Sequence, residues 1–217
     1  MFNRVSYKKA AKQELKGNWK VPVLVTLVYT LIIGIISLVG QNKNEAVTFA
    51  SSLYSILTIL ISGMMEMALI CYFFNFISTK SETKFEYFIS SLNRWKDGIL
   101  GTLWISLWVF LWSLLFLIPG IVKAYSYKFT LYILAENPGI SVRQAMNISK
   151  ELTKGHKADL FVLDLSFIGW GFLCLLTLGI GFLWLTPYMY TATIHAYQDI
   201  KQSALDSGKI TEQDFSI

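Results

Sequence analysis

Long apolar runs, each of membrane-spanning length, dominate the hydrophobic pattern of this chain. The runs cover residues 19–40, 52–78, 98–120 and 158–200. One α-helix needs roughly 20 such residues to cross about 30 Å of hydrocarbon. The last run is long enough for two helices, with a Gly-Ile-Gly break at 179–181, and the segment 118–139 reads as one more helix between two Pro-Gly pairs. The pattern therefore predicts six transmembrane helices.

Short amphipathic stretches precede the apolar runs, and this combination occurs three times. Segments 12–20, 90–98 and 149–157 each place a leucine before basic residues and a glycine, ahead of an apolar run. The similarity is either a structural repeat or a shared requirement of membrane entry, where basic residues gather. With a repeat, residues 1–217 form one membrane domain. Its units are 1–80, 81–138 and 139–205, followed by a cytoplasmic tail, 206–217.

Two of the short stretches, 83–95 and 141–152, carry signals for the start of a helix. Each opens with a capping box, in which side chains satisfy the exposed amides of a first helical turn. The boxes pair Thr83 with Glu86 and Ser141 with Gln144. The apolar residues of the first stretch share one face, as a helix lying in the membrane interface requires. We therefore expect an all-α, polytopic integral membrane protein with six transmembrane helices in three hairpins and cytoplasmic interfacial helices.

The composition and the placement of charge agree with a membrane protein. Of the 217 residues, 54% are hydrophobic and 15% are charged, whereas a soluble domain carries about 25% charged residues. With six spans, nearly all lysines and arginines outside the apolar runs fall on the side that holds both termini, and Lys43 stands on the other side. The positive-inside rule then places both termini in the cytoplasm. Because membrane lipids account for the net charge of +5, nucleic acid is not expected as a partner.

Three motifs in the C-terminal half carry a family resemblance. They are IPGIVKAYSYKFTLYILAENPGIS, SKELTKGHKADLFVLDLSFIGWGFL and LTLGIGFLWLTPY, all within 118–200. This text resembles the bacterial integral membrane proteins grouped as domain of unknown function family 975, and the N-terminal half agrees mainly in layout. The resemblance implies a bacterial plasma membrane protein, mostly with Gram-positive relatives. It implies no activity and supplies no catalytic residues.

Four charged residues lie inside the predicted spans: Glu66, Lys123, Lys128 and Asp164. A charge at the centre of a span costs at least ~2.5–3.5 kcal/mol on insertion scales, so such residues usually face the bundle interior and pair. At about 1.5 Å per residue, Glu66 and Lys128 fall near mid-membrane and Asp164 falls somewhat nearer the cytoplasm. We therefore predict an intramembrane charge cluster of Glu66, Lys128 and Asp164.

Small polar residues lead along one helix face towards Glu66. Ser55, Thr58 and Ser62 follow one another at spacings of three and four, which places them on the same side of a helix. One interpretation is a hydrated path to the charge cluster. The other is a packing seam, because small residues let membrane helices approach closely.

The start of the segment 118–139 is a second candidate contact. A helix that begins at Pro119–Gly120 would present amides with partial positive charge, which favour anions. Lys123 follows within one turn, so Lys123 and Gly120 could contact an anionic ligand or a lipid head group. Alternatively, Lys123 extends its ammonium to water at the outer face.

Two function hypotheses follow from these features. The first is a small transporter-like or ligand-binding membrane protein built around the charge cluster. The second is a structural, accessory or protective membrane subunit that binds a protein or lipid partner without transport. An enzyme is not expected, because no nucleophile–base arrangement, metal motif or phosphate-binding loop appears, and no cofactor is implied. Expected partners are membrane lipids, with a membrane protein or a second copy of the chain left open.

Overall fold

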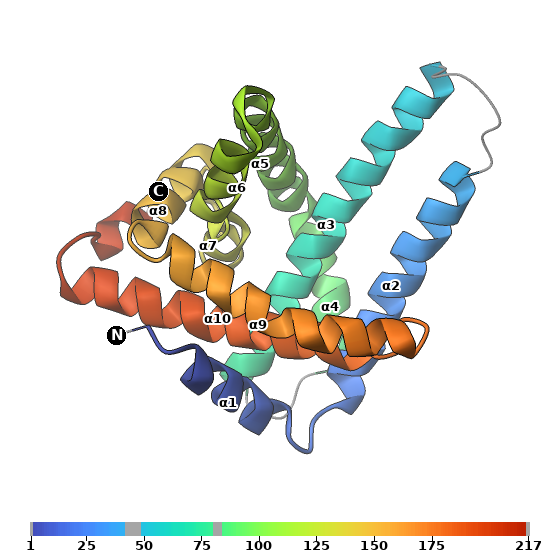
Figure 1. Ribbon diagram of the computed structural model, residues 1–217, viewed down its shortest axis with the longest axis horizontal. Helices are drawn as coiled ribbons and strands as arrows, with labels where there is room; N and C mark the ends of the chain where they lie inside the picture. The colour runs from blue at the N-terminus through green and yellow to red at the C-terminus, as the bar shows by residue number, and fades with distance from the viewer. Residues whose placement is uncertain (1, 42–48, 80–83, 216–217) are drawn as a thin grey trace.

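The computed structural model describes residues 2–41, 49–79 and 84–215, so Lys43 and the predicted cap at Thr83 lie outside the described residues. Throughout this part of the chain the regular elements are helical, as predicted (Figure 1). The helices are α1 (Arg4–Leu15), α2 (Lys20–Gln41), α3 (Phe49–Thr79), α4 (Phe85–Ser91), η1 (Leu92–Arg94), α5 (Trp95–Leu115), α6 (Leu117–Ser126), α7 (Thr130–Glu136), α8 (Val142–Thr153), α9 (Lys157–Leu176), α10 (Phe182–Asp206) and η2 (Glu212–Phe215).

Four helical segments within the described residues are long and apolar enough to cross a membrane. They are Lys20–Leu38, Tyr54–Thr79, Phe85–Leu115 and Lys157–Leu176. The predicted single helix over 118–139 is wrong, because α6 and α7 have 10 and 7 residues with a break between them. Neither piece alone reaches the roughly 20 residues that a span needs. α10 is long enough at 25 residues, but threonine, tyrosine and charged side chains lower its hydropathy.

Short and long helices follow one another along the chain. The short helices α1, α4 and α8 each come before a long apolar helix, α2, α5 and α9. α2 contacts α3, α5 contacts α6, and α9 contacts α10. Figure 1 shows α1 running alongside α10, and α10 also packs against α2 and α3. The C-terminal half of α3 thus becomes the centre of the fold.

The core is built on α3, where Met67, Tyr72 and Phe73 are fully buried. α3 crosses α5 at two glycines: a Cβ added to Gly98 would lie 2.5 Å from the carbonyl oxygen of Gly63. Helices in lipid approach this closely only where the side chains are small. By contrast, most apolar side chains of α5 and several of α2 remain exposed, which suits helices whose solvent is lipid.

The predicted helix over 141–152 is present as α8, and its start is capped as expected. The hydroxyl of Ser141 accepts a hydrogen bond from the Gln144 N–H at 3.2 Å. The predicted helix over 83–95 appears as α4 and η1, which lead directly into α5. The apolar face of α8 is buried in the protein core, where Ala145 and Leu152 are fully covered. α8 therefore contributes to the core rather than only covering it.

Candidate functional site

A break in the chain between α6 and α7 carries the first group of candidate site residues. Ser149 of α8 satisfies the backbone there: its hydroxyl donates to the carbonyl of Ser126 at 2.9 Å and accepts from the Phe129 N–H at 3.2 Å. The hydroxyl of Thr153 also lies 3.3 Å from the Ser126 carbonyl. A broken helix is tolerated at membrane depth only where other groups bond its free backbone. Side chains of α8 thus supply the hydrogen bonds that the backbone loses at the break.

Lys128 sits in this break and pairs with Asp164 of α9. Its ammonium lies 2.5 Å from each carboxylate oxygen, and the hydroxyl of Tyr125 donates to the same carboxylate at 2.9 Å. The ammonium also lies 5.3 Å from the centre of the Tyr125 ring. Asp164 is seven residues beyond Lys157, the first residue of α9, or about 10 Å along the helix. The pair therefore joins α9 to the break.

Glu66, the third member of the predicted cluster, lies in a different group. It accepts a hydrogen bond at 2.6 Å from the hydroxyl of Tyr190, whose ring stacks on Phe73 with ring centres 5.4 Å apart. Among the described residues, Glu66 forms no ion pair. The structure thus divides the predicted cluster into two contacts. The depth estimate assumed a continuous helix over 118–139, whereas the break turns Lys128 towards α8 and α9.

The predicted anion contact at Gly120 and Lys123 also differs from the expectation. The Gly120 N–H is already bonded to the carbonyl of Phe116 at 3.3 Å. A Cβ at Gly120 would lie 2.1 Å from the hydroxyl oxygen of Ser113, so this glycine serves the close contact between α5 and α6. The ammonium of Lys123 lies 4.4 Å from the centre of the Trp112 ring. Its positive charge and that of Lys157 repel each other.

The small polar face of α3 directs two of its hydroxyls back to its own helix. Thr58 donates to the carbonyl of Tyr54 and Ser62 donates to that of Ile59, both at 2.9 Å. Ser55 is exposed. The close contact with α5 comes from the neighbouring Gly63. The hydroxyls of Thr58 and Ser62 therefore need no water to be hydrogen-bonded, and we keep the packing interpretation as the prediction for this face.

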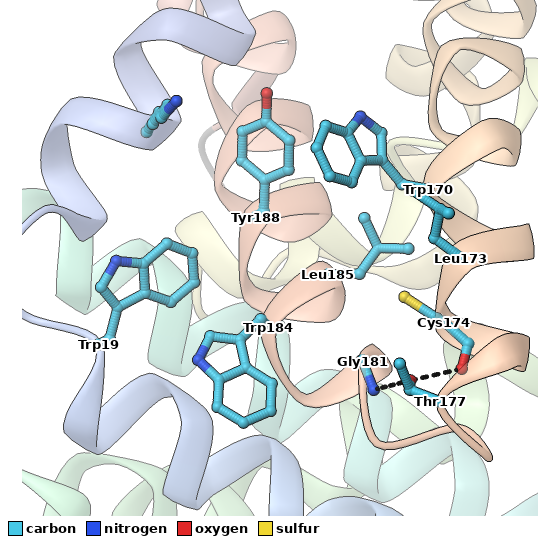
Figure 2. Close-up of a pocket in the computed structure, with 10 residues that line it drawn as sticks. Trp19, Trp170, Leu173, Cys174, Thr177, Gly181, Trp184, Leu185 and Tyr188 are labelled. Carbon is cyan, nitrogen blue, oxygen red and sulfur yellow. Dashed lines mark hydrogen bonds between the residues drawn. The ribbon is translucent and has the colours of Figure 1, made fainter.

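A groove between the N-terminal region and α9–α10 is a further candidate site. Its volume is about 410 Å³, and aromatic rings form most of its wall: Trp19 before α2, Trp170 on α9, and Trp184 and Tyr188 on α10. Figure 2 shows these four rings arranged around the groove, with Leu185 at its floor. Trp170 and Trp184 remain 55% and 48% exposed. The wall is apolar apart from Lys12 of α1, the hydroxyl groups of Tyr188 and Thr177, and the indole N–H groups.

The turn that closes the groove depends on a glycine. A Cβ at Gly181 would lie 2.8 Å from the sulfur of Cys174, so only glycine lets α10 begin this close to α9. The Gly181 N–H donates to the hydroxyl of Thr177 at 3.0 Å, and that hydroxyl donates to the Cys174 carbonyl at 2.8 Å (Figure 2). These bonds hold the end of α9 against the start of α10.

α1, which contributes Lys12 to the groove, is held on α10 by polar contacts. The hydroxyl of Tyr7 donates to the carboxylate of Asp199, and a carboxylate oxygen of Glu14 lies 3.2 Å from Nε2 of His195. Burial, then the bond to Asp199, raises the pKa of Tyr7 to about 12. α1 is therefore a fixed part of the fold rather than a free N-terminal arm.

The sequence interpretation missed the groove, although two signals pointed to it. Lys8 and Lys12 are four residues apart on one face of α1, and Trp184 and Tyr188 are four apart on α10. Each pair is visible in the sequence. Only the tertiary structure shows that these faces of α1 and α10 meet.

Comparison with family models places the chain in a known family. The model of a family described as "Protein of unknown function (DUF975)" matches residues 1–131 and 116–204. It agrees with the resemblance read from the C-terminal motifs. The comparison with curated proteins found no match, and neither did the comparison with solved structures.

Proposed function

Since the chain belongs to this family of unknown function, whose description assigns no activity, we propose a function from the geometry. The protein is a ligand-binding protein of the bacterial plasma membrane, and it takes the apolar part of a membrane amphiphile into the groove between α1 and the α9–α10 pair. The single observation that carries the proposal is this groove of about 410 Å³ with its aromatic wall. Tryptophan and tyrosine suit the membrane interface, where one side of the ring is apolar and one edge is wet.

The size and lining of the groove support an acyl chain as its occupant. Ligand sites usually fall between about 300 and 1,000 Å³ and combine apolar walls with a few polar groups. Here the polar groups include Lys12 and Tyr188, while Leu173 and Leu185 line the apolar part. A fatty chain can lie between these rings without leaving any polar group of its own unbonded.

Counting retained lipids tests the proposal. The protein is purified from bacterial membranes, and co-purified amphiphiles are counted by native mass spectrometry. Leu173→Trp fills the groove, whereas Phe172→Trp changes the preceding residue on α9, which is exposed and does not line the groove. We expect wild type and Phe172→Trp to retain an amphiphile and Leu173→Trp to lose most of it. Equal retention by both variants would reject the groove as the site.

The break at Lys128 supports a second candidate function, a transporter-like role. Many transporters bind substrate at interrupted helices, where half-helix ends and charged side chains meet. Lys128 occupies such an interruption and pairs with Asp164 of α9, with side chains 18% and 35% exposed. In this hypothesis a substrate replaces one partner of the ion pair. Uptake or efflux that Lys128→Met abolishes without loss of folded protein would favour it.

A further inference from the structure

Beside the groove lies a second cavity, and four cations line it. It also measures about 410 Å³, and its basic residues all come from α1. They are Arg4, Lys8, Lys9 and Lys12. Ser166 of α9 and Tyr188 of α10 contribute hydroxyl groups to the same cavity. Across the described residues, none of these four cations takes part in an ion pair. The cavity is therefore suited to an anion.

The two cavities adjoin, because Lys12 and Tyr188 line both of them. One end of the combined site is basic and hydroxyl-bearing, and the other end is apolar and aromatic. A molecule that fills both cavities must carry an anionic head group joined directly to an apolar chain. That is the chemistry of a phospholipid with a negatively charged head group.

Lys8 shows how the basic cavity is held ready. Its ammonium donates to the carbonyl and the hydroxyl of Ser166 at 3.2 and 3.1 Å, and it lies 4.6 Å from the centre of the Phe167 ring. Burial, then the charge of Arg4, lowers the pKa of Lys8. An anion placed between Lys8 and Arg4 would relieve this repulsion. The side chain is thus oriented by α9 even without an anionic partner.

We propose that the groove binds an anionic phospholipid, with its phosphate among Arg4, Lys8, Lys9 and Lys12 and an acyl chain among Trp19, Trp170 and Trp184. This inference rests on the proposed function and specifies its ligand. The positive charge of the cavity favours an anionic lipid over a zwitterionic lipid, because each lysine or arginine near a membrane surface strengthens the attraction to anionic lipid. The adjoining apolar groove decides for a lipid over a free anion.

Lipid competition tests the inference. The full-length protein is placed in nanodiscs of equal phosphatidylglycerol and phosphatidylcholine, then released into non-ionic detergent, and retained lipids are counted by native mass spectrometry. We expect phosphatidylglycerol to be retained about tenfold over phosphatidylcholine, in line with the attraction of a few clustered cations. Lys9→Gln with Lys12→Gln should abolish this preference. Both side chains are exposed, so the fold does not depend on them.

The control is Lys16→Gln with Lys20→Gln, which removes the same charge from residues outside both cavities and should keep the preference. If wild type retains the two lipids equally and Leu173→Trp retains neither, the inference is overturned and the proposed function stands. Displacement of the lipid by millimolar glycerol phosphate would show a site for a free anion and overturn it as well. Retention of neither lipid would overturn the inference, and absence of any amphiphile on protein purified from bacterial membranes would reject the proposed function as well.

Discussion

The ammonium of Lys128 lies 2.5 Å from both carboxylate oxygens of Asp164, and this contact ties the break between α6 and α7 to α9. The two residues are 36 positions apart in the sequence. Tyr125 adds a third hydrogen bond to the same carboxylate. The first prediction follows from this contact.

Lys128→Met should destabilise the protein by about 3 kcal/mol, at the low end for a broken buried pair because Asp164 is about one-third exposed. Adding Asp164→Asn should recover part of the loss, since it removes the stranded charge. Adding Glu66→Gln should recover nothing, because Glu66 bonds Tyr190 instead. Thermal unfolding in detergent measures all of these, with Lys123→Met as the control. Recovery by Glu66→Gln rather than Asp164→Asn would contradict the observed pairing.

The second prediction compares Gly98, at the crossing of α3 and α5, with Gly171 on α9, and expects opposite effects on stability. Gly98→Ala would place a Cβ 2.5 Å from the Gly63 carbonyl and 2.7 Å from the Met67 Cβ, so the helices must move apart at a cost of about 1–3 kcal/mol. Gly171→Ala on α9 meets nothing within 4 Å and should stabilise the helix by up to about 1 kcal/mol. Unfolding temperatures that move in the same direction would argue against this packing.

The polar face of α3 gives a third prediction. Because the hydroxyls of Thr58 and Ser62 bond their own helix, a cysteine at Ser62 should react poorly with a membrane-impermeant thiol reagent. Cysteine at the exposed Ser90 should react readily, while the native Cys71 and Cys174 are buried and set the background. Rapid labelling at Ser62→Cys would restore the hydrated-path interpretation.

The contact between Tyr7 and Asp199 predicts a pH dependence at the alkaline end. A tyrosine whose pKa is about 12 when folded and about 10 when unfolded contributes stability that is complete below pH ~10. That contribution is lost as the pH rises towards 12. Tyr7→Phe should therefore cost about 1 kcal/mol at pH 8, and the difference from wild type should shrink above pH 10. Tyr87→Phe, at an exposed position, should show no such convergence.

Topology is the subject of the fifth prediction. Both termini should be cytoplasmic, because with six crossings nearly all basic residues outside the apolar runs would lie on the side that the termini share. Reporter fusions at the C-terminus and at Lys43 should report opposite sides. An extracellular C-terminus would require an odd number of crossings.

Local features of the chain were read correctly from the sequence because they depend on neighbouring residues. The length of an apolar run predicts whether a helix can span a membrane, as at Lys20–Leu38 and Lys157–Leu176. The cap at Ser141 needs only the amide three residues later. The family motifs were equally visible, since each of them is a run of consecutive residues.

The tertiary structure alone decided where the long segment 118–139 breaks and which charges meet. At the break, Ser149 and Thr153 of α8 bond the backbone carbonyl of Ser126, and no pattern within the segment 118–139 contains these partners. The break turns Lys128 to Asp164 and leaves Glu66 to Tyr190.

The groove shows the same division between local pattern and assembled structure. The sequence by itself determined that basic residues share a face of α1 and that Trp184 and Tyr188 share a face of α10, because helical spacing sets which residues share a face. Only the folded chain placed Lys12 beside Tyr188 and Trp170, from helices more than 150 residues apart. Distant helices join through packing and polar contacts such as Tyr7 with Asp199, and these depend on three-dimensional fit that no local periodicity encodes.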